Sequence, residues 1–389
     1  MGKRVPKLRF PEFSGEWEEK KLGEVCALRK EKYDPRLSNN SYRCVELEDI
    51  LGEAGGITNT KDSLRQNSIK TFFKAGDVLY GKLRPYLHKY AHPDFNGVCS
   101  TEIWCLFGTE VSNRYLYHLI QTSNFDKAAN KSCGTKMPRA DWEIVSDNTI
   151  YVPKLIEQQK IADFLSTVDN IITSEQRILD DLQLKKKGLM QKLFSRELRF
   201  KDKDGREFPE WEAKRLGEVC SLRKEKYDPK TSKSSFRCIE LEDIISETGN
   251  IINTKNSLNQ SSIKTIFKAG DVLYGKLRPY LHKYAHPDFD GVCSTEIWCL
   301  YGTDITNSYL YFLIQMPDFD KVANKSCGTK MPRAEWDVVS NKIVYIPILE
   351  EQKKIAEYLG SQDSVIEEQR KIVDGWKLRK KGLLQQMFV

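Results

Sequence analysis

The chain contains an internal sequence repeat in two copies, and this repeat constrains its fold more than any other feature. Every cysteine of the first half recurs 194 residues later, as do three of the tryptophans. Residues 74–107 differ from residues 268–301 at only two positions, and residues 130–140 recur unchanged at 324–334. Such a period is too long for a solenoid unit, so we expect each copy to be a domain with its connector. Two similar domains predict a covalently fused dimer with pseudo-twofold symmetry.

Length and composition allow two or three ordinary domains. The chain has 389 residues, 40% of them hydrophobic and 30% charged, which is sufficient for each domain to bury a core. The net charge of +7 is a small difference between 62 Lys and Arg and 55 Asp and Glu, so nucleic-acid binding is permitted but not demanded. No apolar stretch approaches the roughly 20 residues needed to cross a bilayer, and no signal-peptide pattern is visible. We therefore expect a cytoplasmic protein that does not enter a membrane.

The cysteines give little support to a disulfide framework. There are ten, but they are five positions doubled, and none forms a C-x-x-C pair. Thiols in a reducing compartment behave as small buried apolar residues, which is the interpretation we favour here.

Each copy begins with short mixed patterns and ends in one long helical pattern. Strand-like runs at residues 77–80 and 98–106 are followed by helical patterns at residues 115–120, with Asn113 as the expected N-cap, and near residues 126–130. This order predicts a compact α+β domain. The expected boundaries are residues 1–155 and 197–348 for the globular domains, and 156–196 and 349–389 for the helices.

The two helical segments carry apolar residues at heptad spacing, which is typical of a coiled coil. A helix from residue 157 to 194 would span roughly 57 Å. If the second helix packs against the first, it must run antiparallel, with one globular head at each end. The heptad series has gaps at Glu175 and Lys186. The residues expected in helix pairing or partner docking are Ile161, Leu165, Val168, Ile172, Leu179, Leu182, Ile355, Leu359, Ile366 and Val373.

The predicted fold is therefore α+β: two similar globular domains joined by two long antiparallel helices in a pseudo-twofold coiled coil. Two equivalent heads suit a target with matching twofold features, and duplex DNA is the common one.

Two basic clusters recur in both copies. Residues 82–90 interleave cations with tyrosines, and residues 134–139 place two cations on a loop with glycine and proline. Lys and Arg neutralise phosphates, Arg binds guanine edges, and tyrosine hydroxyls reach phosphate or sugar. The alternative is solvated surface cations, and duplication copies neutral residues as faithfully as functional ones. The candidate DNA-binding residues are Lys82, Arg84, Tyr86, His88, Lys89, Thr135, Lys136 and Arg139, with Lys276, Arg278, Tyr280, His282, Lys283, Thr329, Lys330 and Arg333 in the second copy.

The order of domain, helix, domain and helix resembles the specificity (S) subunit of type I restriction-modification systems. The segments that carry the resemblance are Phe10-Pro11-Glu12-Phe13 before Trp17 and Lys21-Leu22-Gly23-Glu24, their counterparts Phe208-Pro209-Glu210-Trp211 and Arg215-Leu216-Gly217-Glu218, residues 76–86, and the junctions at residues 153–162 and 347–356. The resemblance covers essentially the whole chain.

The resemblance implies that each head is a target recognition domain reading half of a bipartite DNA sequence. It also implies helices that set the spacer and dock two methyltransferase (M) subunits, and restriction (R) subunits that join through that core. S-adenosylmethionine, ATP and Mg would be bound by those partners, and the methylated base would be adenine. The chain carries neither an Asp/Asn-Pro-Pro-aromatic motif nor a G-x-x-x-x-G-K-[ST] loop, so we expect a non-catalytic subunit without a cofactor.

Three features of the sequence allow a second interpretation. His88 and His92, repeated as His282 and His286, have a spacing that binds zinc on a helix, but prolines bracket the pair and no thiol is suitably placed, so no metal is expected. A protein-binding scaffold with two heads and no nucleic acid is the alternative function. The runs at residues 185–187 and 379–381 could contact DNA, but cations near a helix C-terminus are favoured by its dipole in any case.

The near identity of the heads predicts an inverted-repeat target with two similar half-sites and a non-specific spacer. Divergence between the copies is concentrated at residues 36–42 against 230–236, and at residues 52–73 against 246–267. If these stretches touch bases, the two half-sites differ at one or more positions.

Overall fold

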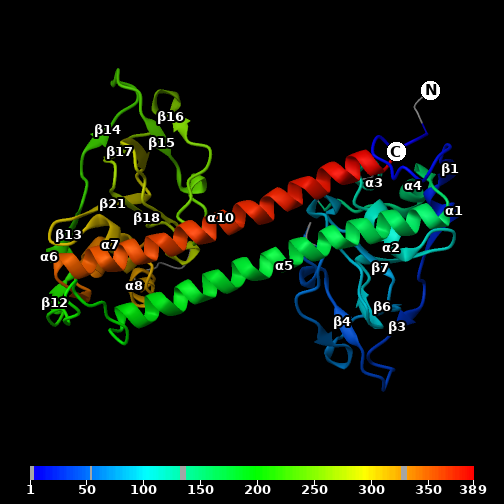
Figure 1. Ribbon diagram of the computed structural model, residues 1–389, viewed down its shortest axis with the longest axis horizontal. Helices are drawn as coiled ribbons and strands as arrows, with labels where there is room; N and C mark the ends of the chain where they lie inside the picture. Colours follow the sequence, from blue (N-terminus) through cyan, green and yellow to red (C-terminus); the bar gives the residue numbers. More distant parts are fainter. Residues whose placement is uncertain (1–3, 53–54, 132–136, 326–330) are drawn as a thin grey trace. The chain divides into compact units, whose positions relative to one another are not determined.

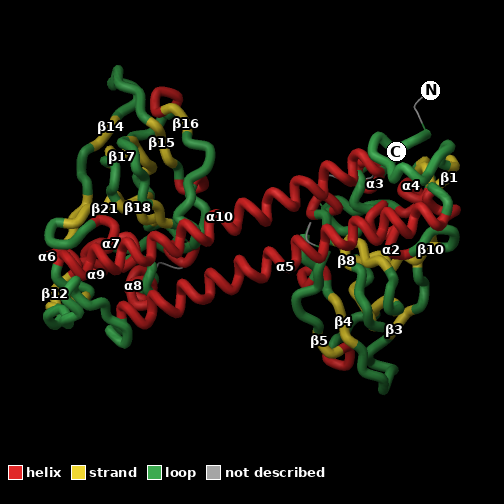
Figure 2. The backbone as a smooth tube through the Cα atoms, in the orientation of Figure 1, coloured by secondary structure: helices red, strands yellow, loops and turns green. Residues whose placement is uncertain are grey.

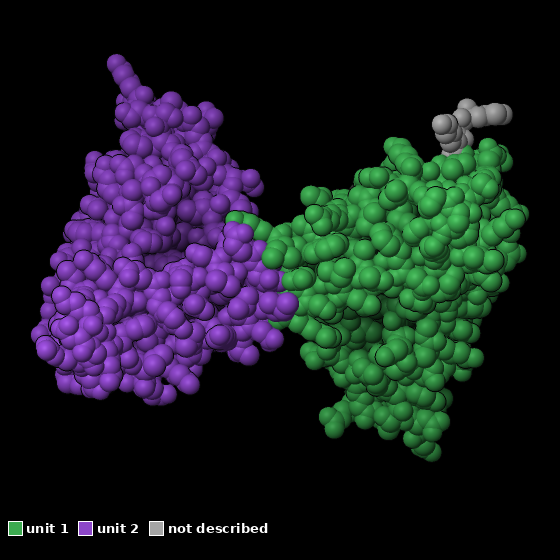
Figure 3. Space-filling model, viewed as in Figure 1, with its two compact units in different colours: residues 1–177, 370–389 green, residues 178–369 purple. Residues whose placement is uncertain are grey.

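The computed structural model describes residues 4–52, 55–131, 137–325 and 331–389. These form two compact units, Met1–Arg177 with Arg370–Val389, and Ile178–Gln369 (Figure 3). The division lies within the two long helices because each unit includes part of both.

The first unit contains eleven strands in its described residues, all short, and four short helices before the long one. The strands are β1 (Glu18–Lys21), β2 (Cys26–Leu28), β3 (Lys32–Tyr33), β4 (Arg43–Val45), β5 (Lys61–Asp62), β6 (Lys70–Phe73), β7 (Val78–Gly81), β8 (Tyr90–Ala91), β9 (Gly97–Ser100), β10 (Ile103–Gly108) and β11 (Thr149–Val152). The helices are α1 (Leu22–Val25), α2 (Asn113–Leu119), α3 (Ser123–Asn130), α4 (Trp142–Ser146) and α5 (Leu155–Phe194).

The second unit repeats these elements in the same order. Its strands are β12 (Glu212–Arg215), β13 (Cys220–Leu222), β14 (Lys226–Tyr227), β15 (Arg237–Ile239), β16 (Lys255–Asn256), β17 (Lys264–Phe267), β18 (Val272–Gly275), β19 (Tyr284–Ala285), β20 (Gly291–Ser294), β21 (Ile297–Gly302) and β22 (Ile343–Ile346). Its helices are α6 (Leu216–Val219), α7 (Asn307–Leu313), α8 (Pro317–Ala323), α9 (Trp336–Ser340) and α10 (Leu349–Met387).

Each unit is layered, with helices on one face of a four-stranded sheet and a five-stranded sheet on the other (Figures 1 and 2). In the first unit the strand orders are β2-β10-β7-β8 and β3-β6-β9-β4-β5, and only the β4–β9 pair is parallel. Side chains of a strand alternate between its faces. Val78 and Tyr80 of β7 therefore join the core beneath the helices, whereas Leu79 joins the core between the sheets.

The long helices run antiparallel within each unit. Lys380 Nζ of α10 lies 2.6 Å from Asp169 Oδ1 of α5 in the first unit, and Lys186 Nζ lies 2.5 Å from Asp363 Oδ1 in the second. The heptad gap at Lys186 is thus filled by an ion pair, and one lysine of each basic run is a helix-pairing residue. Of the ten predicted pairing residues, only Ile172 and Leu182 are less than fully buried.

One predicted cap was wrong. The N-cap of α2 is Ser112, whose hydroxyl accepts a hydrogen bond from Tyr115 N. Asn113 lies inside the helix, where its side chain accepts from Gly108 N at 2.7 Å and donates to Gly76 O at 2.6 Å. Asn113 was mistaken for the cap because Ser and Asn are equally favoured at that position.

The eight cysteines that the structure describes are buried and unbridged. Burial raises the pKa of the Cys26 thiol to about 12, so this thiol stays protonated and inert at neutral pH. Over the described residues, no helix combines the length and the hydropathy that a membrane crossing requires.

Candidate nucleic-acid interface

The first basic cluster forms a tight turn between β7 and β8, which we call the basic turn (residues 82–90, and 276–284 in the second unit). Its centre is a 3-10 helix, Pro85–Leu87, whose flanking residues Arg84 and His88 both adopt a left-handed backbone, with φ of 53° and 48°. Such a conformation costs a non-glycine residue roughly 1–2 kcal/mol. The second unit repeats it at Arg278 and His282. Four strained residues persist only because the surrounding contacts determine them.

The second basic cluster is hydrogen-bonded to the basic turn. Arg84 N donates to Pro138 O at 2.7 Å, and Ala140 N donates to Lys82 O at 2.8 Å. In the second unit, Arg278 N donates to Pro332 O at 2.7 Å. Two stretches that are about 55 residues apart in the sequence therefore form one surface, a pairing that the sequence did not reveal.

The guanidinium of Arg139 is held by a carboxylate beside the turn. Its Nε and Nη2 donate to the two oxygens of Glu102 at 2.9 and 3.3 Å, and this hydrogen bonding raises the pKa of Arg139. Arg333 and Glu296 repeat the arrangement. A bidentate pair fixes the orientation of the guanidinium plane on an exposed surface.

His88 and Lys89 hold the turn in place. His88 Nε2 lies 2.9 Å from Asp126 Oδ1 of α3. Lys89 Nζ donates to Leu47 O at 2.7 Å and Ile50 O at 2.8 Å. His282 and Lys283 make the matching contacts in the second unit. Because the Lys89 ammonium is used inside the domain, we leave Lys89 and Lys283 out of the proposed contact surface.

His92 also has a structural contact. Its Nε2 donates to Gly76 O at 3.1 Å, its ring stacks on Tyr117, and burial lowers its pKa. Among the described residues, no group of three or more His, Cys, Asp or Glu side chains could hold a metal ion.

The exposed part of the basic turn is the remaining candidate site. Arg84 is exposed and Lys82 is half-buried, and neither forms an ion pair with another described residue. The Tyr86 side chain is 53% exposed and Tyr280 is 52% exposed. Thr135, Lys136, Thr329 and Lys330 lie outside the described residues.

Two stretches that differ between the copies are hydrogen-bonded to each other in each unit. Tyr33 Oη donates to Asn40 O, Ser41 Oγ donates to Asp62 Oδ1, and Tyr42 N donates to Ser63 Oγ. The Ser41 and Tyr42 bonds join residues 36–42 to the β5 region at one edge of the five-stranded sheet. We call the described residues among 36–42 and 52–73, that is 36–42, 52 and 55–73, the variable edge. The basic turn is unchanged between the units, whereas the variable edge is not.

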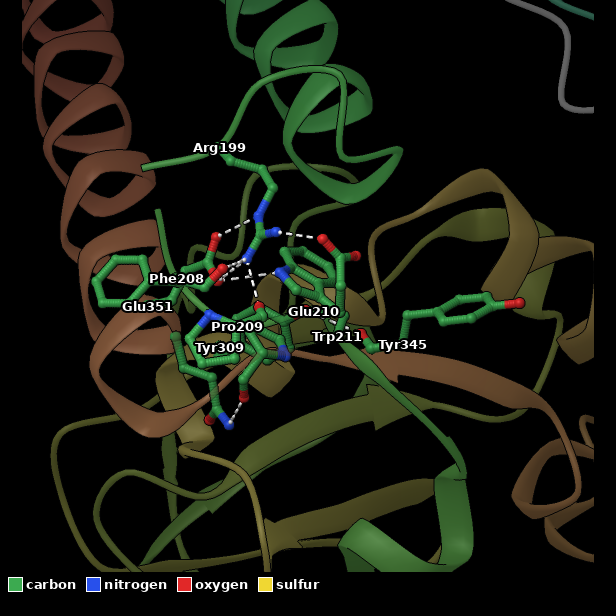
Figure 4. Close-up of polar contacts among 10 residues, drawn as sticks. Arg199, Phe208, Pro209, Glu210, Trp211, Tyr309, Tyr345 and Glu351 are labelled. Atoms are coloured by element: carbon green, nitrogen blue, oxygen red, sulfur yellow. Dashed lines mark hydrogen bonds and ion pairs between the residues drawn. The ribbon is translucent and has the colours of Figure 1, made fainter. Parts of the chain in front are cut away.

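Each unit also contains a buried ion pair that sequence reasoning missed. Figure 4 shows Arg199 between Glu351 of α10 and Glu210. The indole N–H of Trp211 donates to the carboxylate of Glu351. In the first unit, Arg9 Nε donates to Glu157 Oε1 at 2.7 Å, and Trp17 Nε1 donates to Glu157 at 3.3 Å. The carboxylate raises the pKa of Arg9 and of Arg199.

A sequence signal for this ion pair does exist. Leu8-Arg9-Phe10 recurs as Leu198-Arg199-Phe200 at an offset of 190 residues, four short of the main period. Because its offset differs from the main period, this short repeat is not visible when the two copies are aligned at 194 residues.

Two α+β units with one unchanged basic turn each, built on paired helices, define a protein of two similar halves. The model of the type I restriction modification DNA specificity domain matches residues 14–184 and 209–373. The chain therefore belongs to the type I restriction-modification specificity family and carries two copies of its domain. This confirms the family predicted from the sequence. Specificity subunits are the non-catalytic DNA-recognition components of these systems, so the chain is not itself an enzyme.

Named relatives agree in length and fold. The chain is 27% identical to the type I restriction enzyme MjaVIII specificity subunit of Methanocaldococcus jannaschii, over 98% of this chain and 93% of that protein. A chain from the structure titled "Structural basis underlying complex assembly and conformational transition of the type I R-M system" has a TM-score of 0.55 at 21% identity, covering 95% of this chain and 97% of its own. The S subunit of M. genitalium has a TM-score of 0.54 at 14% identity, with 99% of both chains covered. At these identities the solved structures support the fold.

Proposed function

We propose that each unit of this specificity subunit reads one half of a bipartite DNA target, and that the two half-sites form an inverted repeat. The observation that carries the proposal is the basic turn. Its exposed residues are the same in both units, whereas buried positions elsewhere have changed, such as His118 to Phe312. Two equal basic turns would read equal bases, and the half-sites would differ only where the variable edge also touches bases.

The chemistry of the turn supports contact with DNA. Arg84 and Lys82 carry positive charge without an ion partner among the described residues, and Arg139 is oriented by Glu102. Arg binds guanine edges and phosphates, and Lys neutralises phosphates. We assign the positioning contacts to Lys82 and the base contacts to Arg84 and Arg139, with Lys276, Arg278 and Arg333 in the second unit.

The partner proposals follow from the family. The paired helices would set the spacer between half-sites and dock two methyltransferase subunits, and restriction subunits would join through that core. S-adenosylmethionine, ATP and Mg would belong to those partners. The exposed faces of α5 and α10 are available for such docking, since many residues of both helices between the buried positions are exposed.

Mapping of methylated adenines in a host that expresses the complete system tests the proposal. We expect two similar, inverted half-sites separated by a fixed number of unread bases. Two unrelated half-sites would contradict the inverted repeat while leaving DNA recognition intact.

Arg84→Ala and Arg278→Ala test the role of the turn. Each substitution removes one contact of the kind worth about 1–3 kcal/mol, so we expect affinity for the mapped duplex to fall about tenfold or more per arginine. Arg206→Ala is the matched control, since Arg206 has 78% of its side chain exposed outside the turn. If the complex with methyltransferase subunits binds no duplex even at low salt, the scaffold alternative replaces the proposal.

A further inference from the structure

We propose that Tyr86, and Tyr280 in the second unit, is a wedge that presses its ring against a base step and unstacks it. This inference rests on the proposed function and specifies how the basic turn contacts the duplex. It also predicts that part of the recognition comes from DNA deformability.

The placement of the ring is the first argument. Tyr86 lies at the centre of the 3-10 helix with its side chain 53% exposed, and Tyr280 repeats this at 52%. No hydrogen bond or ring contact joins either tyrosine to another described residue. Of the described tyrosines, only Tyr86, Tyr280 and Tyr345 are exposed, and the first two lie at the same position of the basic turn in their units. Both units therefore expose a large aromatic ring in the basic turn, and this ring forms no hydrogen bond or ring contact with another described residue. Such a ring is suited to contact with a binding partner.

The rigidity of the turn is the second argument. The residues on both sides of the 3-10 helix, Arg84 and His88, have left-handed backbones. Their geometry is fixed by Pro138 O, which accepts from Arg84 N, and by Asp126, which contacts His88. Lys89 adds two bonds to backbone carbonyls. A wedge must resist being pushed back, and this turn is connected to three other segments of its domain.

The charged residues near Tyr86 in the sequence indicate which kind of partner its ring contacts. Lys82 and Arg84 precede Tyr86 in the same turn, and Met137, which is 51% exposed, precedes Pro138, whose carbonyl accepts from Arg84 N. Proteins that kink DNA combine cations on the phosphates with an apolar group between bases. A neutral protein surface would leave these cations without a counter-charge, whereas duplex DNA offers both phosphates for the cations and base steps for an apolar ring.

The experiment uses the full chain assembled with its methyltransferase subunits and the duplex found by methylation mapping. 2-Aminopurine replaces successive adenines, and its fluorescence rises when a base loses its stacking neighbours. We expect a severalfold rise at one step in each half-site with the unmodified protein. With Tyr86→Ala and Tyr280→Ala together, the duplex should still bind with its salt dependence unchanged, but the rise should vanish.

Two further variants separate the wedge from other roles. Tyr86→Phe and Tyr280→Phe keep the ring and lose the hydroxyl, so the rise should persist; its loss would mean a hydroxyl contact to phosphate and overturn the wedge. Tyr345→Ala is the matched control, since that tyrosine is 46% exposed on a strand, and it should change nothing.

The outcomes distinguish the wedge from the proposed function. Tight binding by the unmodified protein without a fluorescence rise at any position overturns the wedge and leaves recognition standing. Loss of the methyltransferase subunits from the Tyr86→Ala and Tyr280→Ala protein during purification overturns it in favour of a protein contact. Failure of the unmodified complex to bind any duplex overturns both.

Discussion

The two units use different side chains at one equivalent position, where a short helix packs beneath the paired long helices. In the first unit this side chain is His118, which is fully buried. Its Nδ1 lies 3.9 Å from Asp169 Oδ2, and neither atom has a hydrogen-bond partner in the described structure. In the second unit the position is Phe312, with Lys186 Nζ 5.2 Å from its ring centre. The first unit is therefore polar here, and the second is aromatic.

Both units keep an ion pair between the long helices, although the side chain that packs beneath this pair differs. Asp169 with Lys380 and Asp363 with Lys186 are retained, although their neighbour has changed. The histidine makes the first unit sensitive to acid. Burial, and then the charge of Lys380, lowers the pKa of His118 to about 3, whereas a phenylalanine has no titration. Burial raises the pKa of Asp169, against the opposing effect of Lys380.

The largest loss of stability is expected from Glu157→Leu and Glu351→Leu, one substitution in each unit. Each removes the carboxylate of a buried ion pair, so the indole N–H loses its acceptor and the guanidinium keeps only its other acceptors, such as Gly15 O for Arg9 and Glu210 for Arg199. Loss of one partner of such a pair costs about 3–5 kcal/mol. We expect each substitution to destabilise its own unit, as measured by amide hydrogen exchange in β7 and β18. Equal loss of protection in both strands would show that the units do not unfold separately.

The same ion pair marks the limit of prediction from sequence. The two similar domains, the α+β fold class and the long paired helices could be predicted because each follows from a pattern along the chain. The partner of Arg9 is 148 residues away, and no periodicity connects the two. The contact between the basic turn and residues 138–140 was hidden for the same reason. The candidate cluster at residues 82–90 was found by composition, but composition could not separate Arg84, which faces solvent, from Lys89, which caps backbone carbonyls.

A smaller effect is expected when the lysine of each helix pair is removed. Lys186→Met removes the ammonium that lies 2.5 Å from Asp363 Oδ1, and the cost should fall below the about 3–5 kcal/mol of a fully buried pair because this pair is only partly buried. Lys380→Met removes the ammonium that lies 2.6 Å from Asp169 Oδ1, while burial, the largest cause of the lowered His118 pKa, remains. Removal of Lys380 eliminates one of the two main causes that lower the pKa of His118.

Nuclear magnetic resonance of the five histidines measures this directly. The pKa of His118 should rise in the Lys380→Met protein and stay unchanged in the Lys186→Met protein. An unmoved His118 titration in both would contradict the coupling.

His118→Phe should make the first unit resemble the second. The folded-state pKa of His118, about 3, lies below the unfolded value of about 6.5, so the unfolded state binds more protons between these values. Stability from this group is therefore present above pH 6.5 and is lost as the pH falls towards 3. At pH 5 the loss is about 2 kcal/mol. Denaturant titration at pH 7 and pH 5 should show less acid sensitivity in the variant, and Phe312→His should introduce it in the second unit. Identical pH dependence of His118→Phe and the unmodified chain would refute the assignment.

The smallest effect is expected from Asp62→Asn, a change to the residue found in the second unit. Asp62 Oδ1 accepts from Leu64 N at 3.0 Å and from Ser41 Oγ at 2.8 Å, and Asn256 Oδ1 makes the same two contacts at 2.9 and 3.0 Å. The cap is therefore preserved, and we expect no measurable change in the melting temperature at pH 7. Hydrogen bonding to Leu64 N lowers the pKa of Asp62, so the unmodified protein loses this contribution as the pH falls through that depressed value, whereas the asparagine does not. A clear loss of stability at pH 7 would mean that the charge itself, and not the acceptor oxygen, holds the variable edge together, and the two units would then differ there in how they fold and not only in what they contact.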